Sequence, residues 1–357
     1  MPNTIATSPF VVRDLAENRV HRKGEGGEQM KIIGLEEHLV TDEILGAWSQ
    51  LGPEQQADKL KIAGPGDLEA RLRDLGDERI KNMDDCGVDV QVLSLTSPGV
   101  QNLEPAESVA VARQVNDFIA AAVRGRPDRF EGFATLPTPA AAQAALELRR
   151  CVTDLGCKGA MLCGRTRDRN VDHPDFRPIF EEAARLRVPL YLHPQVPQRA
   201  VRDVYYSGFG EPLDQAFAAF GIGWHYETGI QLLRLILAGT FDRHPDLQII
   251  VGHWGEVILY YLDRIDALSK MARGLRRPIS EYVKSNVFVT PSGMFSHVHL
   301  RRSIEILGVD RIMFATDYPF QLAPGGGART FLEGAGLSRE DQEKIAHGNW
   351  ERLFSRA

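Results

Sequence analysis

The feature of this chain that most limits its possible folds is a regular alternation of short apolar runs with longer amphipathic stretches. Several of the short runs are almost continuously apolar, as a β-strand covered on both faces requires. They lie at 31–36, 90–95, 130–136, 159–163, 189–193, 248–251, 287–290 and 311–315. The amphipathic stretches repeat apolar residues at helical intervals, at 67–83, 107–123, 140–155, 177–186, 228–237, 257–271, 299–307 and 339–347.

Eight strands alternating with eight helices predict an α/β fold of the (β/α)8, or TIM, barrel type, extending over residues 31–357. A doubly wound open sheet uses the same alternation, but no G-x-G-x-x-G segment follows the first strand here. Residues 1–30 lack sustained periodicity, and we expect an arm that is flexible or contacts a partner. The polar segment 41–66 is expected to be a long first βα loop, and such loops usually form lids or pocket walls.

Composition and charge exclude several classes of protein. The 357 residues are 43% hydrophobic and 25% charged, which is typical of a soluble globular protein. A net charge of −6 without a basic stripe argues against nucleic-acid binding, and no apolar run is long enough to cross a membrane. The four cysteines lack C-x-x-C spacing, so we expect reduced core thiols and a cytoplasmic protein rather than a zinc–cysteine site.

Side chains that could bind a metal follow four of the eight predicted strands. They are Glu36 and His38 at the first strand, His193 at the fifth, His253 at the sixth and Asp317 at the eighth. The C-terminal ends of barrel strands meet on one face, where active sites are built. In an open sheet the same residues would be spread across its width. We therefore expect these five side chains to converge.

Each of these residues also has an ordinary structural explanation. The Glu and His of the first strand share one side, opposite Glu37, but this pattern is more often structural than metal-binding. His193 alone fits a core histidine bonded to a backbone carbonyl. His253, with Glu256 one helical turn later, fits a helix cap as well as an oriented imidazole, and Asp317 could cap a helix. Their coincidence at strand ends, in barrel order, favours one shared site.

The donor types indicate which ion such a site would hold. Two imidazoles and two carboxylates suit Zn²⁺, Mn²⁺ or another divalent first-row metal. No thiolate takes part, which argues against a closed structural zinc site. The sequence therefore predicts one divalent metal ion, either Zn²⁺ or Mn²⁺, as the cofactor.

The sequence resembles the decarboxylating branch of the amidohydrolase superfamily. That branch includes the γ-resorcylate, 2,3-dihydroxybenzoate and 5-carboxyvanillate decarboxylases and, more distantly, the aminocarboxymuconate semialdehyde decarboxylases. The likeness covers about 31–354 and rests on the segments LEEH (35–38), LTSPGVQ (95–101), RPDRF (126–130), LHP (192–194), GHWGE (252–256) and TDYPF (316–320).

The resemblance implies a role for each candidate residue. It implies four metal ligands, namely Glu36, His38, His193 and Asp317. It also implies that Asp317, His253 and Glu256 are catalytic, with His253 on the wall opposite the ligands. The expected substrate-binding residues are Trp224, His225 and Phe320, although His225 stands where relatives tend to have an aromatic residue.

The first motif bears on the type of reaction. Many hydrolytic relatives begin with H-x-H, whereas this chain has Glu36 followed by His38, which places it nearer the hydroxybenzoate decarboxylases. The 5-carboxyvanillate type lacks a histidine matching His38, so that substrate is less expected here. An anionic ligand also donates charge to the ion, which should weaken its power to ionise water.

The implied activity is non-oxidative decarboxylation of a hydroxylated aromatic acid, with Asp317 delivering a proton to the ring carbon that bears the carboxylate. The expected partners are this aromatic carboxylate and further copies of the chain, as a homodimer or homotetramer. The alternative is a metal-dependent hydrolase, for example a lactonase, in which Asp317 is the base for a metal-bound water. A catalytically inactive scaffold is disfavoured because every candidate ligand is present.

Overall fold

The computed structural model describes residues 29–52 and 68–355, so the predicted arm at 1–30 lies almost wholly outside the described residues. The strands are β1 (Ile33–Leu39), β2 (Val90–Leu95), β3 (Phe130–Gly132), β4 (Ala134–Thr135), β5 (Ala160–Cys163), β6 (Leu190–His193), β7 (Ile249–Val251) and β8 (Val287–Val289). The longer helices are α1 (Asp42–Ser49), α4 (Asp77–Cys86), α5 (Pro105–Gly125), α6 (Ala141–Thr153), α7 (Arg177–Leu186), α10 (Gly223–Leu237), α14 (Ile279–Asn286) and α15 (His297–Leu307). The shorter ones are α3 (Leu68–Arg73), α8 (Arg199–Tyr205), α9 (Leu213–Ala216), α11 (Thr240–Arg243), α12 (His253–Glu256), α13 (Leu262–Asp266), α16 (Gly327–Glu333), α17 (Arg339–Glu343) and α18 (Asn349–Phe354).

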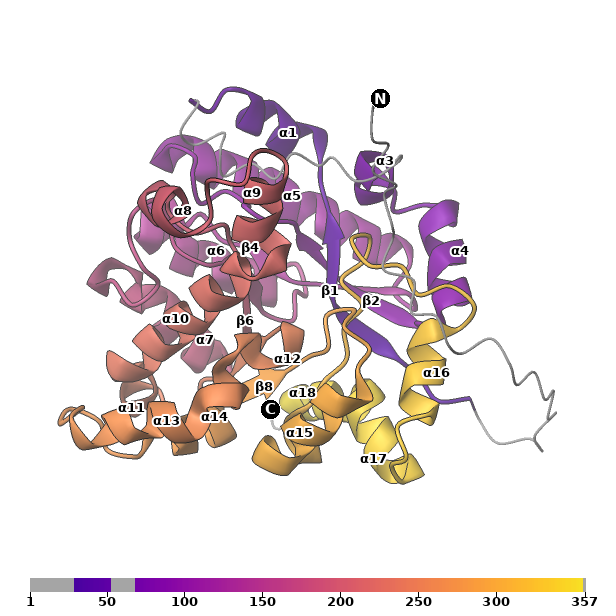
Figure 1. Ribbon diagram of the computed structural model, residues 1–357. Coiled ribbons are helices and arrows are strands. Elements are labelled where there is room, and N and C mark those ends of the chain that lie inside the picture. The colour runs from indigo at the N-terminus through magenta and orange to yellow at the C-terminus, as the bar shows by residue number, and fades with distance from the viewer. Residues whose placement is uncertain (1–28, 53–67, 356–357) are drawn as a thin grey trace, which may run out of the picture. The chain divides into compact units, whose positions relative to one another are not determined.

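The strands form two parallel sheets that follow the order of the sequence. One sheet contains β1, β2 and β3, and the other runs from β4 to β8 (Figure 1). The sheets meet between β3 and β4, where Phe133 N–H donates to Leu93 O at 2.9 Å and Ala134 N–H donates to Gly159 O at 2.8 Å. The third predicted strand is therefore shared between the two sheets.

The eighth predicted strand closes the ring, although only a few ladder bonds hold it. Segment 311–315 lies between β8 and β1, with Met313 N–H donating to Val289 O at 2.9 Å. On its other side Leu35 N–H donates to Phe314 O at 3.0 Å. We call the contact between segment 311–318 and β1 the closing seam. Closure of eight parallel strands confirms the predicted barrel.

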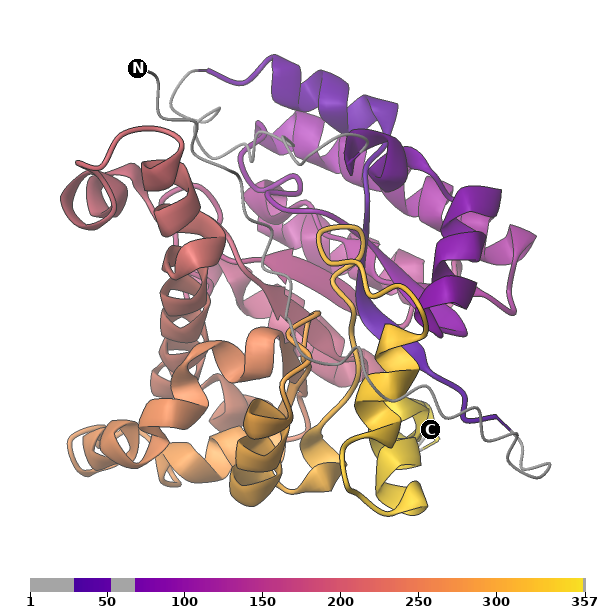
Figure 2. The ribbon, with the colours of Figure 1, turned by 45° about the vertical axis from the view of Figure 1, so that its right-hand side comes forward.

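The barrel interior is filled by side chains from successive strands. Leu35, Met161, Tyr191, Ile250 and Phe288 belong to one buried cluster. The helices lie around the outside of the strands (Figure 2), and α1 and α5 contribute to a second cluster against β1 and β2. No helix within 29–52 and 68–355 is long and apolar enough to cross a membrane. The core therefore sits inside and around the strands and leaves their C-terminal ends for polar residues.

Local sequence explains the elements that match the prediction most closely. β2 and α7 have the predicted bounds. In α7, Ile179, Phe180 and Ala183 recur at helical spacing and are buried against the barrel, and a proline occupies the first turn, where its missing N–H costs nothing. Arg187 ends the helix in the left-handed conformation, which returns the chain towards β6.

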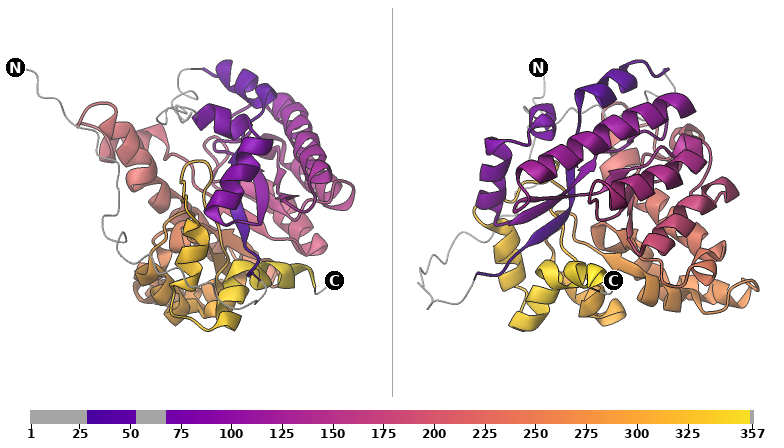
Figure 3. Two further views of the ribbon diagram at one scale, coloured as in Figure 1. Left: turned by 90° about the vertical axis from the view of Figure 1, so that its right-hand side faces the viewer. Right: turned by 180° about the vertical axis from the view of Figure 1, so that it is seen from behind.

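Several predicted elements differ from the structure. The predicted helix 67–83 is two helices, α3 and α4, because Gly76 stands between them and serves as the N-cap of α4. The predicted helix 257–271 is a series of short turns around α13. The predicted loop 41–66 contains α1, which begins where the Thr41 hydroxyl accepts from Ile44 N–H; residues 53–66 lie outside the described part. Helices α8 and α9, which were not predicted, project away from the strands (Figure 3).

Candidate active site

The predicted ligands converge at the C-terminal ends of the strands. Glu36 and His38 lie on β1, His193 ends β6, and Asp317 follows segment 311–315. One nitrogen or oxygen of each of these four side chains lies within 4.8 Å of the others, a group that could hold a metal ion. The predicted convergence of these residues is confirmed.

An irregularity in β1 turns the two candidate ligands of that strand inward. Gly34 pairs with Gln91 but Glu37 pairs with Leu93, so β1 contains one more residue than β2 over this interval. Such a bulge shifts the alternation of side chains by one. Glu36 therefore points into the barrel directly after the buried Leu35. Beyond the bulge the alternation resumes, and His38 joins Glu36 while Glu37 points away, as predicted.

The arrangement of Glu36 leaves one carboxylate oxygen available. Its Oε2 accepts hydrogen bonds from the hydroxyls of Tyr191 and Ser292. Its Oε1 lies 3.2 Å from His193 Nε2 and 3.9 Å from His38 Nε2. A Cβ at Gly252 would lie 2.9 Å from Oε2 and 2.6 Å from Ser292 Oγ, so this position requires glycine.

The spacing and the unsatisfied atoms fit a bound cation. Asp317 Oδ1 lies 3.4 Å from His38 Nε2. Atoms about 2.1 Å from a common ion lie about 3–4 Å from one another, which matches these separations. Glu36 Oε1 and His38 Nε2 are buried without a hydrogen-bond partner, and buried polar atoms are rarely left in that state. The donor set and its geometry therefore suit one divalent ion.

Hydrogen bonds to the far side of each imidazole orient the two histidines. His193 Nδ1–H donates to Pro194 O at 2.8 Å, which leaves the lone pair of Nε2 directed at Glu36. His38 Nδ1 lies 3.3 Å from Ser94 Oγ. Such outer hydrogen bonds fix the tautomer and the ring direction of metal-binding histidines.

A second group lies next to the first. His253 Nδ1 donates to Glu256 Oε1 at 2.7 Å, and His225 Nδ1 donates to Glu256 Oε2 at 2.6 Å. The backbone N–H of His253 also donates to Ser292 Oγ, which in turn donates to Glu36. The predicted pairing of His253 with Glu256 is confirmed. The shared use of Glu256 by His225, from α10, was not predicted.

The turn that holds His253 is unusual. Residues 253–257 all have positive φ, between 47° and 84°. Glu256 lies one turn after His253, as predicted, but this turn has left-handed instead of right-handed backbone. Left-handed backbone costs roughly 1–2 kcal/mol per non-glycine residue, and such strain persists where the surroundings fix it, often at functional sites.

The charges of the two groups shift their titration. Burial alone would raise the pKa of Glu36, but the charges of the neighbouring histidines, His253 above all, hold it below the ordinary value of a carboxyl. Burial, and then the charge of Glu36, raises the pKa of Asp317 well above its ordinary value. Burial would lower the pKa of His253, but the charges of Glu256 and Glu36 raise it to about 9. The two carboxyl groups therefore differ strongly in their affinity for a proton.

The remaining predicted residues lie at different distances from the ligands. The Phe320 ring packs edge-on against His38, with centroids 5.6 Å apart. Trp224 packs against the cluster of Val196, Tyr206 and Ala218, and its buried indole Nε1 has no hydrogen-bond partner. Phe320 thus reaches the group of candidate ligands, whereas Trp224 packs in a separate cluster.

Sequence reasoning missed the hydroxyls that hold Glu36. Tyr191 stands two residues before His193 on the same strand, so the side-chain alternation could have indicated it. Ser292 follows β8, and its contact with Glu36 spans 256 positions, which no local pattern reveals.

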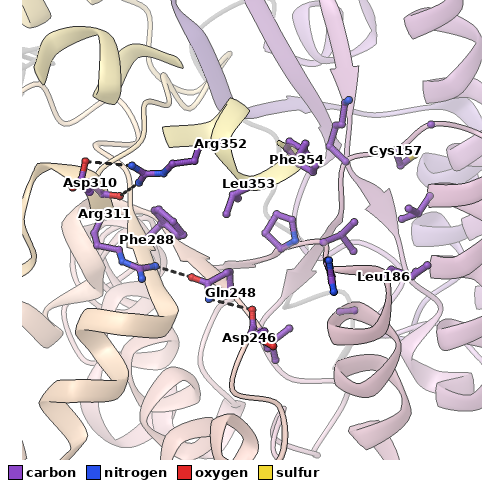
Figure 4. A pocket seen from close by; sticks show the side chains of 18 of the residues that line it. Cys157, Leu186, Asp246, Gln248, Phe288, Asp310, Arg311, Arg352, Leu353 and Phe354 are labelled. Carbon is purple, nitrogen blue, oxygen red and sulfur yellow. Dashed lines mark hydrogen bonds and ion pairs between the residues drawn. The ribbon is translucent and has the colours of Figure 1, made fainter. Parts of the chain in front are cut away.

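A cavity of about 900 Å³ lies elsewhere (Figure 4). It is lined by Pro189 and Gln248, which precede β6 and β7, and by Phe354 of α18. This is the N-terminal end of the strands, opposite the ligand group. In Figure 4, Arg352 pairs with Asp310 and none of the predicted site residues lines the wall. The cavity is therefore not the candidate active site.

Comparison with known proteins agrees with this geometry. The family model described as amidohydrolase matches residues 48–356. The chain belongs to the amidohydrolase family. A γ-resorcylate decarboxylase from Rhodococcus jostii is 37% identical over 339 residues, which are 90% of this chain and 98% of that protein. This match takes in most of the chain and nearly all of the relative.

Two solved structures of similar proteins contain manganese. One is a dihydroxybenzoic acid decarboxylase from Polaromonas with the inhibitor 2-nitroresorcinol, 33% identical over 92% of this chain and 97% of that one, with a TM-score of 0.78. The other is a 5-carboxyvanillate decarboxylase from Novosphingobium aromaticivorans with 4-hydroxy-3-methoxy-5-nitrobenzoic acid, 32% identical over the same shares, with a TM-score of 0.83. The resemblance and the fold predicted from the sequence are confirmed.

We predict that this amidohydrolase-family protein holds about one divalent ion per chain, because four donor atoms surround one point. Elemental analysis of protein purified without chelator should find zinc or manganese in that ratio. Removing the ion should also lower the melting temperature, since an ion that binds only the folded state stabilises it. A metal-free preparation with full activity would contradict the prediction.

Proposed function

We propose that this protein is a metal-dependent decarboxylase of a hydroxylated aromatic carboxylic acid. The group Glu36, His38, His193 and Asp317 carries the proposal, because it combines a metal-binding donor set with a second carboxyl group, that of Asp317, at the position where an ion would bind. Relatives named as decarboxylases, which match about nine-tenths of the chain, support the same reaction.

The four residues of this group would hold the ion, and Asp317 would serve a second purpose. A divalent ion held there would act as a Lewis acid and would help to orient the substrate. Asp317 transfers its proton to the ring carbon that bears the carboxylate. The bond between that carbon and the carboxylate then breaks, its electron pair restores the aromatic ring, and CO2 leaves. Asp317 is left as a carboxylate and regains its proton from solvent.

The neighbouring group of His225, His253 and Glu256 would assist this proton transfer. His253 is held by Glu256 and would hydrogen-bond Asp317 or the departing carboxylate. His225, fixed by the same carboxylate, would contact the substrate together with Trp224 and Phe320. The Phe320 ring packs against His38, and the aromatic ring of the substrate would pack beside it.

The experiment is a panel of hydroxybenzoates assayed for CO2 in buffer containing Mn²⁺ or Zn²⁺. We expect CO2 from at least one of them, and in deuterated water we expect deuterium on the carbon that lost the carboxylate. The alternative, a hydrolase that uses a metal-bound water, predicts hydrolysis of lactones or esters with solvent oxygen in the product and no deuterium on carbon. That second pattern would overturn the decarboxylase.

Two further properties are proposed. Val204, Tyr205, Phe209 and Phe220 expose 66–74% of their surface in the segment around α8 and α9, and large apolar side chains exposed within one segment are common at interfaces. It supports assembly as a homodimer or homotetramer. The four cysteines are free and buried, which supports a reducing, cytoplasmic location.

A further inference from the structure

We propose that Glu37, which points away from the metal ligands, is a positioning residue that holds the closing seam and thereby fixes His38 and Asp317 relative to each other. The inference rests on the proposed metal site, because these two residues are its ligands on either side of the seam. Nothing in the proposed chemistry uses Glu37 itself, although its side chain is fully buried.

Both oxygens of Glu37 bind the residue that precedes Asp317. Glu37 Oε1 accepts from Thr316 N–H at 2.9 Å, and Oε2 accepts from Thr316 Oγ1–H at 2.6 Å. A carboxylate that accepts two bonds from one residue fixes its orientation as well as its distance. The backbone that bears Asp317 is thus tied directly to the residue between Glu36 and His38.

A second chain of contacts ties the same carboxylate to His38. Gln91 Nε2–H donates to Glu37 Oε2 at 3.1 Å, and Arg79 Nε–H donates to Gln91 Oε1 at 2.7 Å. Arg79 also donates from Nη1 to the backbone oxygen of His38 at 2.8 Å. Its guanidinium lies 4.6 Å from the centre of the Tyr318 ring. Arg79 therefore contacts the residue after Asp317 as well as the backbone of His38.

The seam needs such a clamp because regular strand pairing there is sparse. Beside Leu35 N–H to Phe314 O, the seam contains His38 N–H donating to Tyr318 O at 2.7 Å and an isolated bridge between Glu37 and Tyr318. Within the described residues, segment 311–318 forms no named strand. The clamp of Glu37, Thr316, Gln91 and Arg79 supplies the missing constraint where the two ligands face each other.

The backbone is shaped to accommodate this carboxylate. A Cβ at Gly34 would lie 2.3 Å from Glu37 Oε1, so any larger residue would displace it. Gly34 also begins the interval in which β1 has one residue more than β2. The bulge that turns Glu36 towards the other candidate ligands thus also creates the space for Glu37.

The test measures Mn²⁺ affinity by competition with a chelating dye, in Glu37→Gln, Thr316→Val and the double variant. We expect Glu37→Gln to weaken binding by about 10- to 100-fold, the usual effect of removing a residue that orients metal ligands. Thr316→Val keeps its N–H and should weaken binding less. The double variant should be no worse than Glu37→Gln, because both changes disable one clamp.

Glu182→Gln is the matched control. Glu182 is also a buried, ion-paired carboxylate, bound by Arg149 and Arg185 on the outside of the barrel. The Glu182→Gln substitution should lower the melting temperature without changing Mn²⁺ affinity. If Glu37→Gln does not fold, the Mn²⁺ affinity of Thr316→Val is compared with that of Glu182→Gln instead, and a loss in Thr316→Val alone supports the inference.

Three outcomes would overturn the inference: wild-type Mn²⁺ affinity in Glu37→Gln, strictly additive losses in the double variant, or an equal loss in the Glu182→Gln control. The proposed function is judged separately. If the wild-type protein binds Mn²⁺ but releases no CO2, the proposed decarboxylase function is refuted. The Mn²⁺ affinities of the variants then still decide whether Glu37 positions the candidate ligands. A wild type that binds no Mn²⁺ refutes both.

Discussion

Asp317→Asn is expected to abolish CO2 release while leaving the metal ion bound. Asn still offers a side-chain oxygen beside His38, so the ion keeps four possible ligands. It has no carboxylic proton to give to the ring. Loss of the proton donor should lower turnover by at least about 10³-fold, within the range of acid catalysis. The measurement is CO2 release alongside metal content for the purified variant.

The pattern of burial makes Asp317 the candidate for this proton rather than Glu36. Both carboxyl groups are enclosed, but Glu36 is bound by two hydroxyls and surrounded by histidines, and its pKa is held low. The pKa of Asp317 is raised by burial and by the charge of Glu36. Two carboxyl groups whose environments push their pKa values apart commonly divide the acid and anionic roles between them.

A matched variant separates proton delivery from metal binding. Glu36→Gln removes an anionic ligand and should lose the ion together with the activity, whereas Asp317→Asn should lose only the activity. Asp317→Asn that keeps more than about a tenth of wild-type turnover would show that another group supplies the proton. If both variants lose the metal ion equally, the main role of Asp317 is to bind the ion.

The sequence was informative about the site where local pattern determines geometry. Alternation along β1 separated Glu37 from Glu36 and His38, and barrel topology brought His193 and Asp317 to the same end. These inferences needed only the direction of each strand and the position of its last residue. They did not need the contacts between strands.

The rest of the site depends on features that periodicity does not encode. The bulge at Gly34 changes which side of the sheet a residue faces, and it is visible only in the pairing with β2. The left-handed turn after Gly252 contradicts the ordinary preference of L-residues. Glu37 and Thr316 are 279 positions apart, and His225 and Glu256 are 31 apart. Such contacts are set by tertiary packing.

His253→Asn is expected to keep the metal ion and to lower turnover by about 10²-fold or more, the usual scale for a group that assists proton transfer. His253 lies outside the group of four candidate ligands, so metal content should not change. Its imidazole is oriented by Glu256 and is positively charged near neutral pH, because its pKa is raised to about 9. The shorter amide of Asn carries no charge. The measurement is kcat for CO2 release beside elemental analysis.

A matched pair on the surface provides the control. His347 Nδ1 lies 2.8 Å from Glu351 Oε2, which reproduces the contact of His253 with Glu256 far from the ligands. His347→Asn should therefore leave turnover unchanged. Glu256→Gln should give an intermediate loss, because the amide NH2 that replaces one of the two carboxylate oxygens cannot accept the hydrogen bond from His253 or from His225. Equal turnover in His253→Asn and wild type would remove His253 from the mechanism and leave Asp317 to act without it.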